Sequence, residues 1–402
     1  MHVVIACYHH FDSNSGGQVA CLANALAGLE IEVTVFVPSN PETARLHGTV
    51  HFKPRAFSAL ESWLEEVKPA VRETMLLAWT PREVVRRFAA RLRARLAVDY
   101  FVHLEDNELL LTATHLGLDV AALAALPPDE IDRRLAVDER LTHPLHFPGF
   151  MAAASGITVL IDRLAELAPP TLPHLVFWPG YNPAFFRPRE PDFPRRRALG
   201  IGDDVTVLTY PGNVHAMNVE EVRSLYLATC LLNRRGIKAL LLRTGEDYVP
   251  VLDHTMHEAG RHFLSLGKLS GQAEVADALA VADFLVQPGR AGDFNDYRFP
   301  SKLPEFFITG RPVLLPATNL GRFVRDGRDA IVLRRGDAFE VAAQIAALRA
   351  DATRREMLAA NAVSFAREHF DWSRIASRVR QFLLQNRRTY AAPIDRPGSS
   401  RK

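Results

Sequence analysis

Residues 2–38 read HVVIACYHHFDSNSGGQVACLANALAGLEIEVTVFVP. The apolar run at 3–7 predicts a strand, the pattern at about 17–29 predicts a helix, and the apolar run at 32–38 predicts a second strand. Two strands joined through one helix form a βαβ unit, whose strands run parallel because the helix carries the chain back to the edge where it started. This stretch therefore predicts an α/β protein with a parallel sheet.

The same alternation continues along the chain. In the first half, further strands are predicted at 49–52, 75–79, 100–104, 157–160 and 174–178. A helix is predicted to begin at Thr80, with a capping box from Thr80 to Glu83. In the second half, strands are predicted at 205–210, 238–244, 262–266, 284–287, 312–315 and 330–333, and helices at 218–234, 250–259, 272–281, 302–309, 337–349 and 352–388.

A proline-rich segment separates the two halves. Residues 179–200 contain five prolines, which cannot continue a helix or a central strand. A chain of 402 residues is also long for a single core. We therefore expect a Rossmann-like domain at 1–180, a linker at 181–200, a second Rossmann-like domain at 201–370, a terminal helix at 371–390 that packs back on the first domain, and a disordered tail at 391–402. Two doubly wound domains facing each other would enclose a cleft at the carboxyl ends of their strands.

The composition excludes several classes of protein. The formal charge is only +2 and the basic residues are scattered, which argues against a nucleic-acid partner. The three cysteines have no CxxC spacing, and no apolar run reaches the roughly 18 residues of a membrane-spanning helix. The apolar start also lacks a basic leader. We therefore expect a cytoplasmic protein that does not cross a membrane.

Polar loops come directly after two of the predicted strands in the first half. The loop at 8–17 ends in Gly16 and Gly17, where free backbone N–H groups could approach an anion closely; the alternative is a plain tight turn. In the loop at 103–108, three side chains could bind sugar hydroxyls or act on a transferring proton, although Asp106 or Asn107 could simply cap the next helix. These three candidate catalytic residues are His103, Glu105 and Asp106. Neither loop has a metal-ligand spacing, so we predict no metal.

The most informative segment is 287–305, which reads QPGRAGDFNDYRFPSKLPE. Arg298 and Lys302 suit a diphosphate, because arginine offers a planar fork to phosphate oxygens and lysine adds a point charge. Glu305 could accept two ribose hydroxyls or could only favour the positive end of a helix dipole. The other residues of this segment that we predict to share the donor site are Asn295, Asp296, Tyr297, Phe299 and Ser301.

At this segment the chain resembles the large group of retaining GT-B glycosyltransferases usually called family 4. That family carries a Glu-x7-Glu motif and, shortly after it, a small residue, Gly, Lys or Arg, Pro and Val. Glu305 matches the second Glu, and residues 309–313 (TGRPV) match the small-residue-to-Val sequence. The Gly16-Gly17 pair fits the family's glycine loop, His103 fits its cleft histidine, and residues 178–188 fit its interdomain segment. The resemblance covers about residues 1–385 and implies the GT-B architecture, in which two Rossmann-like domains enclose the cleft.

The chain departs from the family's first Glu and from its phosphate-binding pair. Tyr297 stands at the first Glu position, with Asp296 beside it. The Gly-Arg-x4-Lys pair of the family falls on 212–218, where asparagine replaces both basic residues. We hypothesise that Arg243, at the end of the next strand, supplies the missing charge together with the two cations of segment 287–305. Candidates for phosphate or sugar contacts in the altered loop are Asn213, His215 and Asn218.

The resemblance implies a glycosyltransferase that moves a sugar from a UDP-, GDP- or dTDP-sugar to a saccharide, lipid-linked or protein acceptor. It further implies retention of configuration, no metal or other cofactor, a donor bound on the second domain and an acceptor bound mainly on the first. Two alternatives stay open. One is a nucleotide-sugar epimerase or phosphorylase of the same fold. The other is a catalytically silent nucleotide-sugar-binding protein, which the two asparagine replacements would favour.

The predicted helix at 80–96 is rich in arginine. Six arginines surround an apolar stripe, which predicts either a solvated helix face or peripheral contact with anionic lipid at the inner face of the membrane. The arginines are Arg82, Arg86, Arg87, Arg91, Arg93 and Arg95, and the stripe consists of Val84, Val85, Phe88, Leu92 and Leu96.

Overall fold

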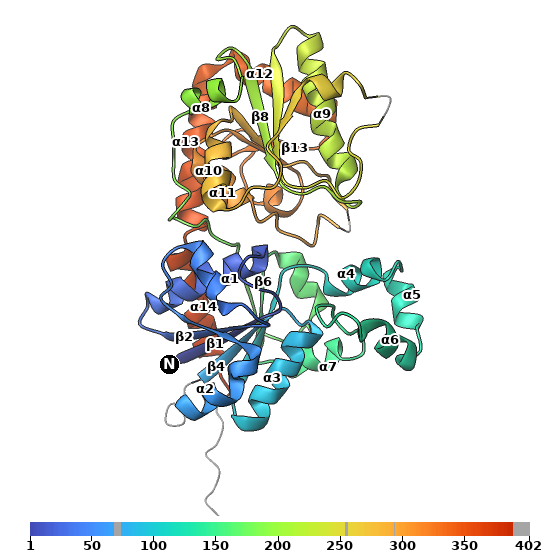
Figure 1. Ribbon diagram of the computed structural model, residues 1–402, viewed down its shortest axis with the longest axis vertical. Helices are drawn as coiled ribbons and strands as arrows, with labels where there is room; N and C mark the ends of the chain where they lie inside the picture. Colours follow the sequence, from blue (N-terminus) through green and yellow to red (C-terminus); the bar gives the residue numbers. More distant parts are fainter. Residues whose placement is uncertain (68–73, 254–255, 293, 389–402) are drawn as a thin grey trace, which may run out of the picture.

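The computed structural model describes residues 1–67, 74–253, 256–292 and 294–388, which fold into two lobes stacked one above the other (Figure 1). The N-terminal lobe contains a seven-stranded sheet and the C-terminal lobe a six-stranded sheet. Neighbouring strands are parallel in both sheets. The predicted α/β fold with two doubly wound sheets is therefore confirmed.

In the N-terminal lobe the strand order is β3-β2-β1-β4-β5-β6-β7. The inner strand β1 is buried along its whole length, because helices cover both faces of the sheet, and this explains why it reads as an unbroken apolar run. The strands are β1 (His2–Cys7), β2 (Glu32–Val37), β3 (Lys53–Ala56), β4 (Thr74–Trp79), β5 (Asp99–Leu104), β6 (Gly156–Val159) and β7 (His174–Val176). The helices are α1 (Asn14–Ala27), η1 (Pro41–His47), η2 (Phe57–Ala59), α2 (Leu60–Glu66), α3 (Glu83–Arg95), α4 (Glu108–His115), α5 (Val120–Ala125), α6 (Pro128–Leu135), α7 (Phe147–Ala152) and η4 (Asp162–Leu167), where η denotes a 3₁₀-helix.

In the C-terminal lobe the strand order is β10-β9-β8-β11-β12-β13. The strands are β8 (Thr206–Pro211), β9 (Ala239–Thr244), β10 (Phe263–Ser265), β11 (Phe284–Val286), β12 (Val313–Pro316) and β13 (Ile331–Leu333). The helices are α8 (Phe193–Ala198), α9 (Val219–Arg234), η5 (Ala259–Arg261), α10 (Gln272–Ala280), α11 (Leu303–Thr309), η6 (Asn319–Arg322), α12 (Ala338–Ala350) and α13 (Ala352–His369). The last described helix, α14 (Trp372–Gln385), lies on the N-terminal lobe.

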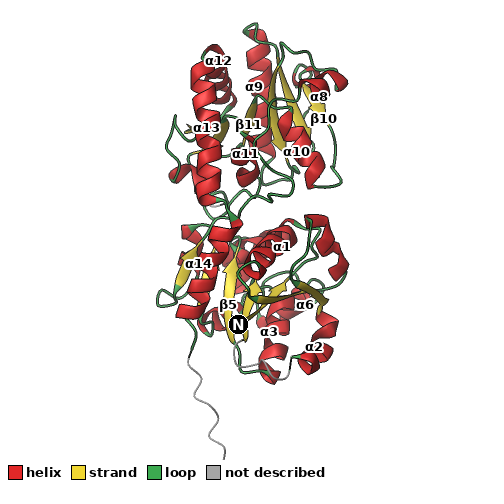
Figure 2. Ribbon diagram, turned by 90° about the vertical axis from the view of Figure 1, so that its left-hand side faces the viewer, coloured by secondary structure: helices red, strands yellow, loops and turns green. Residues whose placement is uncertain are grey.

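The C-terminal chain leaves its own lobe and returns to the first one (Figures 1 and 2). Helix α14 packs beside α1, and the ring of Phe382 meets that of Phe101 edge-on at 5.8 Å. The prediction of a single helix at 352–388 is wrong, because the chain forms two helices there, α13 and α14. The helix is interrupted at residues 370 and 371. The Asp371 side chain caps α14, and the carbonyl of Phe370 accepts a hydrogen bond from the backbone N–H of Tyr181.

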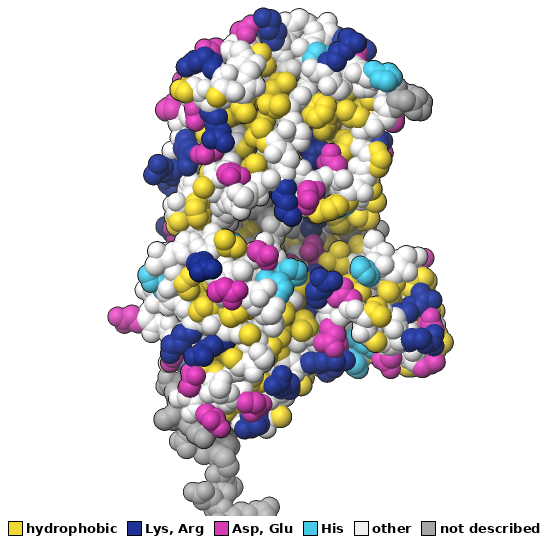
Figure 3. Space-filling model, in the orientation of Figure 1, with side chains coloured by type: hydrophobic (Ala, Val, Ile, Leu, Met, Phe, Trp, Pro, Cys, Tyr) yellow, Lys and Arg dark blue, Asp and Glu magenta, His cyan; other side chains and the backbone are white. Residues whose placement is uncertain are grey.

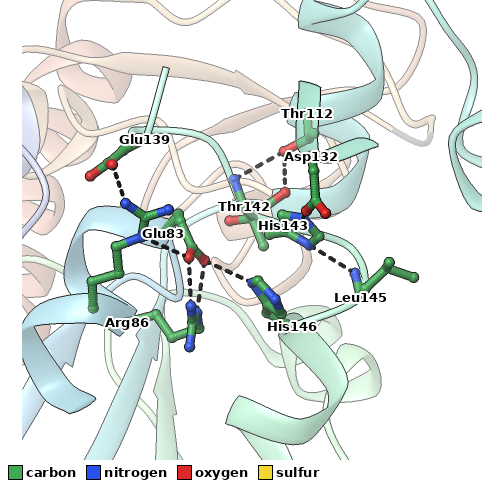
Figure 4. A network of polar contacts seen from close by, with 10 residues as sticks. Glu83, Arg86, Thr112, Asp132, Glu139, Thr142, His143, Leu145 and His146 are labelled. Carbon is green, nitrogen blue, oxygen red and sulfur yellow. Dashed lines mark hydrogen bonds and ion pairs between the residues drawn. The ribbon is translucent and has the colours of Figure 1, made fainter. Parts of the chain in front are cut away.

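The segment between β5 and β6 forms helices α4 to α7, of which the sequence predicted only one (Figure 1). Polar contacts tie its later part to the start of α3 (Figure 4). The carboxylate of Glu83 accepts hydrogen bonds from Arg86 and Arg87 and lies 3.2 Å from Nδ1 of His146. The backbone N–H groups of Glu83 and Val84 donate to carbonyls at 141 and 139. These contacts satisfy the free N–H groups of the helix start.

The predicted capping box at the start of α3 is therefore wrong. Thr80 has a backbone φ of 81°, outside the helical region, and the helix begins at Glu83. The N-cap position is Arg82, whose side chain makes no capping hydrogen bond. The apolar side of α3 packs into the core through Val85, Phe88 and Leu92, so it does not offer an apolar face to lipid.

Three other predicted boundaries differ from the structure. The strand expected at 49–52 lies at 53–56, where it pairs with β2. The linker contains the short helix α8, because Asp192 caps it and Pro194 lies in its first turn, where no N–H partner is needed. The helix expected at 250–259 does not form in the described part of that range; residues 254 and 255 lie outside the described residues, as does the tail predicted at 391–402. No described helix is long and apolar enough to cross a bilayer.

Candidate functional site

Three adjoining cavities lie between the lobes, and Figure 3 shows a recess at this level. The C-lobe cavity, of about 540 Å³, is lined by Tyr210, Gly212, His215, Arg298, Lys302 and Glu305, among others. The N-lobe cavity, of about 390 Å³, is lined by Ser15, Glu105, Asp106, Leu111, Phe294 and Arg298, among others. The hinge cavity, of about 260 Å³, is lined by Gln18, His47, Asn182, Ser270, Glu305 and Trp372, among others. Asn14 and Ser301 line all three cavities, which therefore form one cleft.

Two cations converge on this cleft from the C-terminal lobe. The guanidinium of Arg298 lies 4.5 Å from the ring centroid of Phe294, and Nζ of Lys302 lies 4.2 Å from that of Tyr210. Within the described residues, neither cation forms an ion pair with a carboxylate. Burial lowers the pKa of Lys302 below its ordinary value, while Tyr210 opposes this shift. Two unpaired cations facing a cavity are an unfavourable arrangement that an anionic ligand would relieve.

Glu305 lies at the junction of the C-lobe and hinge cavities. Burial raises the pKa of its carboxyl to about 8, against the attraction of Lys302. The carboxyl is therefore mostly protonated at neutral pH. A group in this state can both donate and accept, which suits recognition of neighbouring hydroxyls.

The loop at 212–218 is held by the asparagines that replace the family's basic pair. The side-chain oxygen of Asn213 accepts a hydrogen bond from the backbone N–H of Glu246. The side chain of Asn218 accepts one from the backbone N–H of His215 and donates one to the carbonyl of Asn213. Gly212 has a φ of 146°, and a Cβ added there would lie 2.4 Å from Nζ of Lys302. The ammonium group of Lys302 therefore occupies the space beside this loop. His215 also lines the C-lobe and N-lobe cavities, and burial lowers its pKa.

Arg243 does not join the two cations of the cleft. It is 2% exposed and is absent from the linings of the three cavities. Its guanidinium donates to the carboxylate of Asp247 at 2.9 Å and to the carbonyl of Gly212 at 2.9 Å. The hypothesis that Arg243 supplies charge to a diphosphate is not supported by this geometry, because a carboxylate already neutralises the side chain.

Three neighbouring residues of the donor segment support the loop instead of lining the cavities. Asn295 donates to Glu221 at 2.6 Å, and Asp296 accepts a hydrogen bond from the Thr318 hydroxyl. Tyr297 reaches the other lobe, where its hydroxyl lies 3.2 Å from the carboxylate of Glu166. Phe299 and Ser301 do line the cleft.

The polar cluster after β5 divides into partly buried and buried members. Asn107 caps α4 by accepting from the backbone of Leu110, which leaves Asp106 free to face the N-lobe cavity. Burial raises the pKa of Asp106, against the attraction of Arg298 and Arg82. Glu105 lines the same cavity but is only 7% exposed.

His103 is sealed inside the N-terminal lobe. It is 0% exposed, Nδ1 lies 2.8 Å from the Thr158 hydroxyl, and its ring lies between Trp79 and Phe177. Burial lowers its pKa to about 3, so the ring is neutral. The prediction that His103 is a cleft histidine is at odds with this position, because the side chain points into the sheet's core.

The paired glycines lie inside α1, which begins at Asn14 because Ser13 caps it through the N–H of Gly16. Packing requires the glycine at 16, where a Cβ would lie 2.2 Å from the carbonyl oxygen of His10. At Gly17 a Cβ would be tight, 3.0 Å from the ring of His47. Gly17 lines the hinge cavity.

Sequence reasoning missed several residues that line the cleft. Asn14 could have been found from the capping pattern that starts at Ser13. Lys268, which lines the C-lobe cavity and lies 3.3 Å from Glu246, gave no signal because it stands alone in a turn. Among the described residues, no group of three or more His, Cys, Asp or Glu is arranged to hold a metal ion.

The comparisons with known proteins found similarity in structure alone. No protein-family model matches the chain, and no curated protein sequence matches it. Anabaena HepE, solved in complex with UDP, is 14% identical with a TM-score of 0.68, and the match covers 96% of this chain and 100% of that one. Sucrose-phosphate synthase from Thermosynechococcus elongatus is 15% identical with a TM-score of 0.60, covering 96% and 98%.

A third similar structure is a Listeria monocytogenes protein described as a putative UDP-N-acetylglucosamine 2-epimerase. It is 12% identical with a TM-score of 0.55, and the match covers 95% of this chain and 95% of that one. All three matches span both lobes, so the arrangement of the two domains is shared as well as each domain. The chain therefore has the GT-B fold, as its motifs led us to expect.

Proposed function

We propose that this protein is a glycosyltransferase that takes a sugar from a nucleoside-diphosphate sugar held in the interlobe cleft. One observation supports this proposal above the others. Arg298 and Lys302 both line the C-lobe cavity, and among the described residues neither forms an ion pair with a carboxylate. A diphosphate would supply the missing negative charge through charge-assisted hydrogen bonds. Glu305 lies beside the cations and is the group we assign to the ribose hydroxyls.

The position of Lys302 explains how the chain could manage without the family's basic pair. Its ammonium group lies against Gly212, directly before Asn213, which stands where the family has arginine. The positive charge therefore reaches the same loop from α11. Because negative charge grows on the diphosphate as the sugar leaves, these cations would stabilise the transition state more than the ground state. We propose that this charge also makes a divalent metal unnecessary.

The similar structures support a nucleotide-sugar donor. HepE was solved with UDP and also with UDP-glucose, and this chain shares its two-lobed fold. We propose that the donor binds mainly to the C-terminal lobe and that the acceptor, a saccharide, lipid-linked or protein group, enters the N-lobe cavity. There Asp106 is the carboxylate best placed to contact an acceptor hydroxyl. Retention of configuration is proposed on the family resemblance alone.

Binding measurements test the donor site. We expect calorimetry with UDP-, GDP-, dTDP- and ADP-glucose to identify one preferred nucleotide, and Arg298→Ala and Lys302→Ala each to weaken its binding by at least about tenfold. The control is Lys238→Ala, which removes an exposed lysine paired with Asp204 at the far end of the lobe. Undiminished affinity in both cleft variants would contradict the proposal, as would the absence of nucleotide binding by the unaltered protein.

A second candidate function is epimerisation of a nucleotide sugar. Two acidic side chains, Glu105 and Asp106, line the N-lobe cavity, and the fold is shared with the Listeria protein described as an epimerase. Incubation of the bound nucleotide sugar without any acceptor separates the two functions. An isomerised sugar would support the epimerase, a glycosylated acceptor the transferase, and binding without turnover a catalytically silent protein.

A further inference from the structure

Glu105 lines the N-lobe cavity, and both oxygens of its carboxylate accept hydrogen bonds from the protein itself. The hydroxyl of Ser15 donates to one oxygen at 2.5 Å, and the indole Nε1–H of Trp79 donates to the other at 2.8 Å. Ser15 is 6% exposed and Trp79 is 0% exposed. The carboxylate thus joins the start of α1 to the ends of β4 and β5.

The hydrogen bonds continue away from the cavity. The hydroxyls of Ser15 and Tyr8 are 3.1 Å apart. Because the proton of Ser15 points to Glu105, Tyr8 is the donor in this bond. The guanidinium of Arg82 covers the Tyr8 ring at 3.7 Å and bonds Glu108, at the start of α4, at 2.9 Å. The network therefore connects two elements, α1 and α4, that line the N-lobe cavity.

We propose that Glu105 is a positioning residue of the cleft, whose carboxylate accepts hydrogen bonds from Ser15 and Trp79 and thereby holds the first turn of α1 where it meets the nucleotide sugar. The inference rests on the proposed function of the cleft. Asn14, next to Ser15, lines all three cavities, so a shift of this turn changes the wall of the whole cleft.

The direction of these hydrogen bonds depends on the charge of Glu105. An indole N–H can only donate, so the oxygen facing Trp79 must accept in either state. A proton on the carboxyl would therefore lie on the oxygen facing Ser15. Ser15 would then accept from Glu105 and donate to Tyr8, which reverses both bonds.

The titratable and charged groups around Glu105 determine the pH at which these two hydrogen bonds reverse. Burial raises the pKa of Glu105 to about 7, although the hydrogen bonds from Ser15 and Trp79 oppose this shift. Asp106 raises the pKa further, and Arg82 lowers it. Among the residues that the structure describes, the other titratable groups that face it are Cys7 and Tyr8, and burial raises the pKa of each above its ordinary value, so both stay neutral through this range.

Nuclear magnetic resonance of the tryptophan indole N–H groups tests the network in the free, full-length protein. The Trp79 signal, identified by its loss in Trp79→Phe, is expected to shift in one step near pH 7. The step should be absent in Glu105→Gln, and its midpoint should rise in Ser15→Ala, which removes a donor to the charged form. A step that survives in Glu105→Gln, or a Trp79 signal that has the same position in Glu105→Gln as in the wild type at pH 8, would overturn the proposal.

Calorimetric binding of UDP-glucose tests the consequence for the cleft. The amide of Glu105→Gln donates to Ser15 and accepts from Trp79, so this variant mimics the protonated state. We expect the fall in affinity from pH 8 to pH 6 to be about tenfold larger in the wild type than in Glu105→Gln, because any effect of Glu305, which also titrates in this range, is common to both proteins. A purely structural role would instead lower the melting temperature without removing the pH dependence.

The two failures can be told apart. Wild-type protein that binds no nucleotide sugar at any pH would sink the proposed function, whatever the Trp79 signal does. Wild-type binding that Glu105→Gln leaves unchanged at pH 8 would sink the positioning role while leaving the proposed function intact.

Discussion

The carboxyl of Glu305 faces two cavities of the cleft and has a pKa of about 8, because the surrounding protein shields this partly buried group from water. An ordinary glutamate in an unfolded chain has a pKa near 4.5. Between these values the folded protein holds a proton that unfolding releases, so this group lowers the free energy of unfolding as pH rises. We expect Glu305→Gln to match the wild type in stability at pH 4.5 and to exceed it by more than about 1 kcal/mol at pH 8.5.

Denaturant unfolding at the two pH values measures this difference. The exposed Glu65 on α2 provides the control, because Glu65→Gln should change stability little and equally at both pH values. If Glu305→Gln were equally less stable than the wild type at both pH values, the carboxyl would be ionised in the folded protein, contrary to the effect expected of its burial.

At the scale of single elements, α3 shows how a tertiary contact can replace a local cap. Glu83 is 6% exposed, and Arg86, Arg87 and His146 hold its pKa at about 2 in spite of burial. Its contribution to stability is therefore complete above about pH 4.5 and is lost as pH falls toward 2. We expect Glu83→Gln to lower the free energy of unfolding by about 2 kcal/mol at pH 7, and by much less at pH 3.

The matched control is Glu61→Gln on the neighbouring helix α2. Glu61 is 53% exposed and pairs with Arg95 of α3 at 2.7 Å, so its removal should cost less than about 1 kcal/mol at pH 7. Urea unfolding measures both variants. Equal costs would show that the buried contacts of Glu83 add nothing to those of a surface ion pair.

At the scale of the whole molecule, α14 ties the end of the chain to the first lobe. Phe382 is 8% exposed, and its ring packs against Gly156 at the start of β6. A Cβ added at Gly156 would lie only 2.9 Å from the ring of Phe382. We expect Phe382→Ala to lower the free energy of unfolding by about 3–5 kcal/mol, because it leaves a cavity under β5 and β6. Leu384→Ala on the same helix, where the side chain is 40% exposed, should cost less than about 1 kcal/mol. Denaturant unfolding of the two variants measures the difference, and equal losses would show that Phe382 adds no more than a surface side chain.

The lobes also meet through the linker and through side chains. Asn182 donates to the carbonyl of His47 at 3.1 Å and to Gln272 at 2.8 Å, so one amide touches both lobes. The indole of Trp178 packs among Phe299, Phe365 and Phe370 at the same boundary. These aromatic side chains are continuous with the hydrophobic core of the N-terminal lobe, so the boundary between the lobes is packed as well as hydrogen-bonded.

Much of the cleft's C-terminal wall was predictable from the segment 287–305. A strand end succeeded by Arg298, Lys302 and Glu305 identified residues that the structure brings to one cavity, because a short loop and a helix start confine them to one edge of the sheet. The segment at 139–146, between α6 and α7, could not be predicted as the anchor of α3, since its contacts with Glu83 join residues about 60 positions apart in the sequence, such as His146.

Local sequence alone was enough to specify the parallel α/β lobes and their strands, because strands buried on both faces must be continuous apolar runs separated by helical patterns. Which polar residues at the strand ends face the cleft was decided only in three dimensions. His103 and Arg243 lie at such ends, but their side chains point into the protein, where they contact Thr158 and Asp247. Asp106 and Arg298, in contrast, face the cavity. The direction of a side chain at the end of a strand depends on the neighbours that the whole fold places around it, and these are distant in sequence.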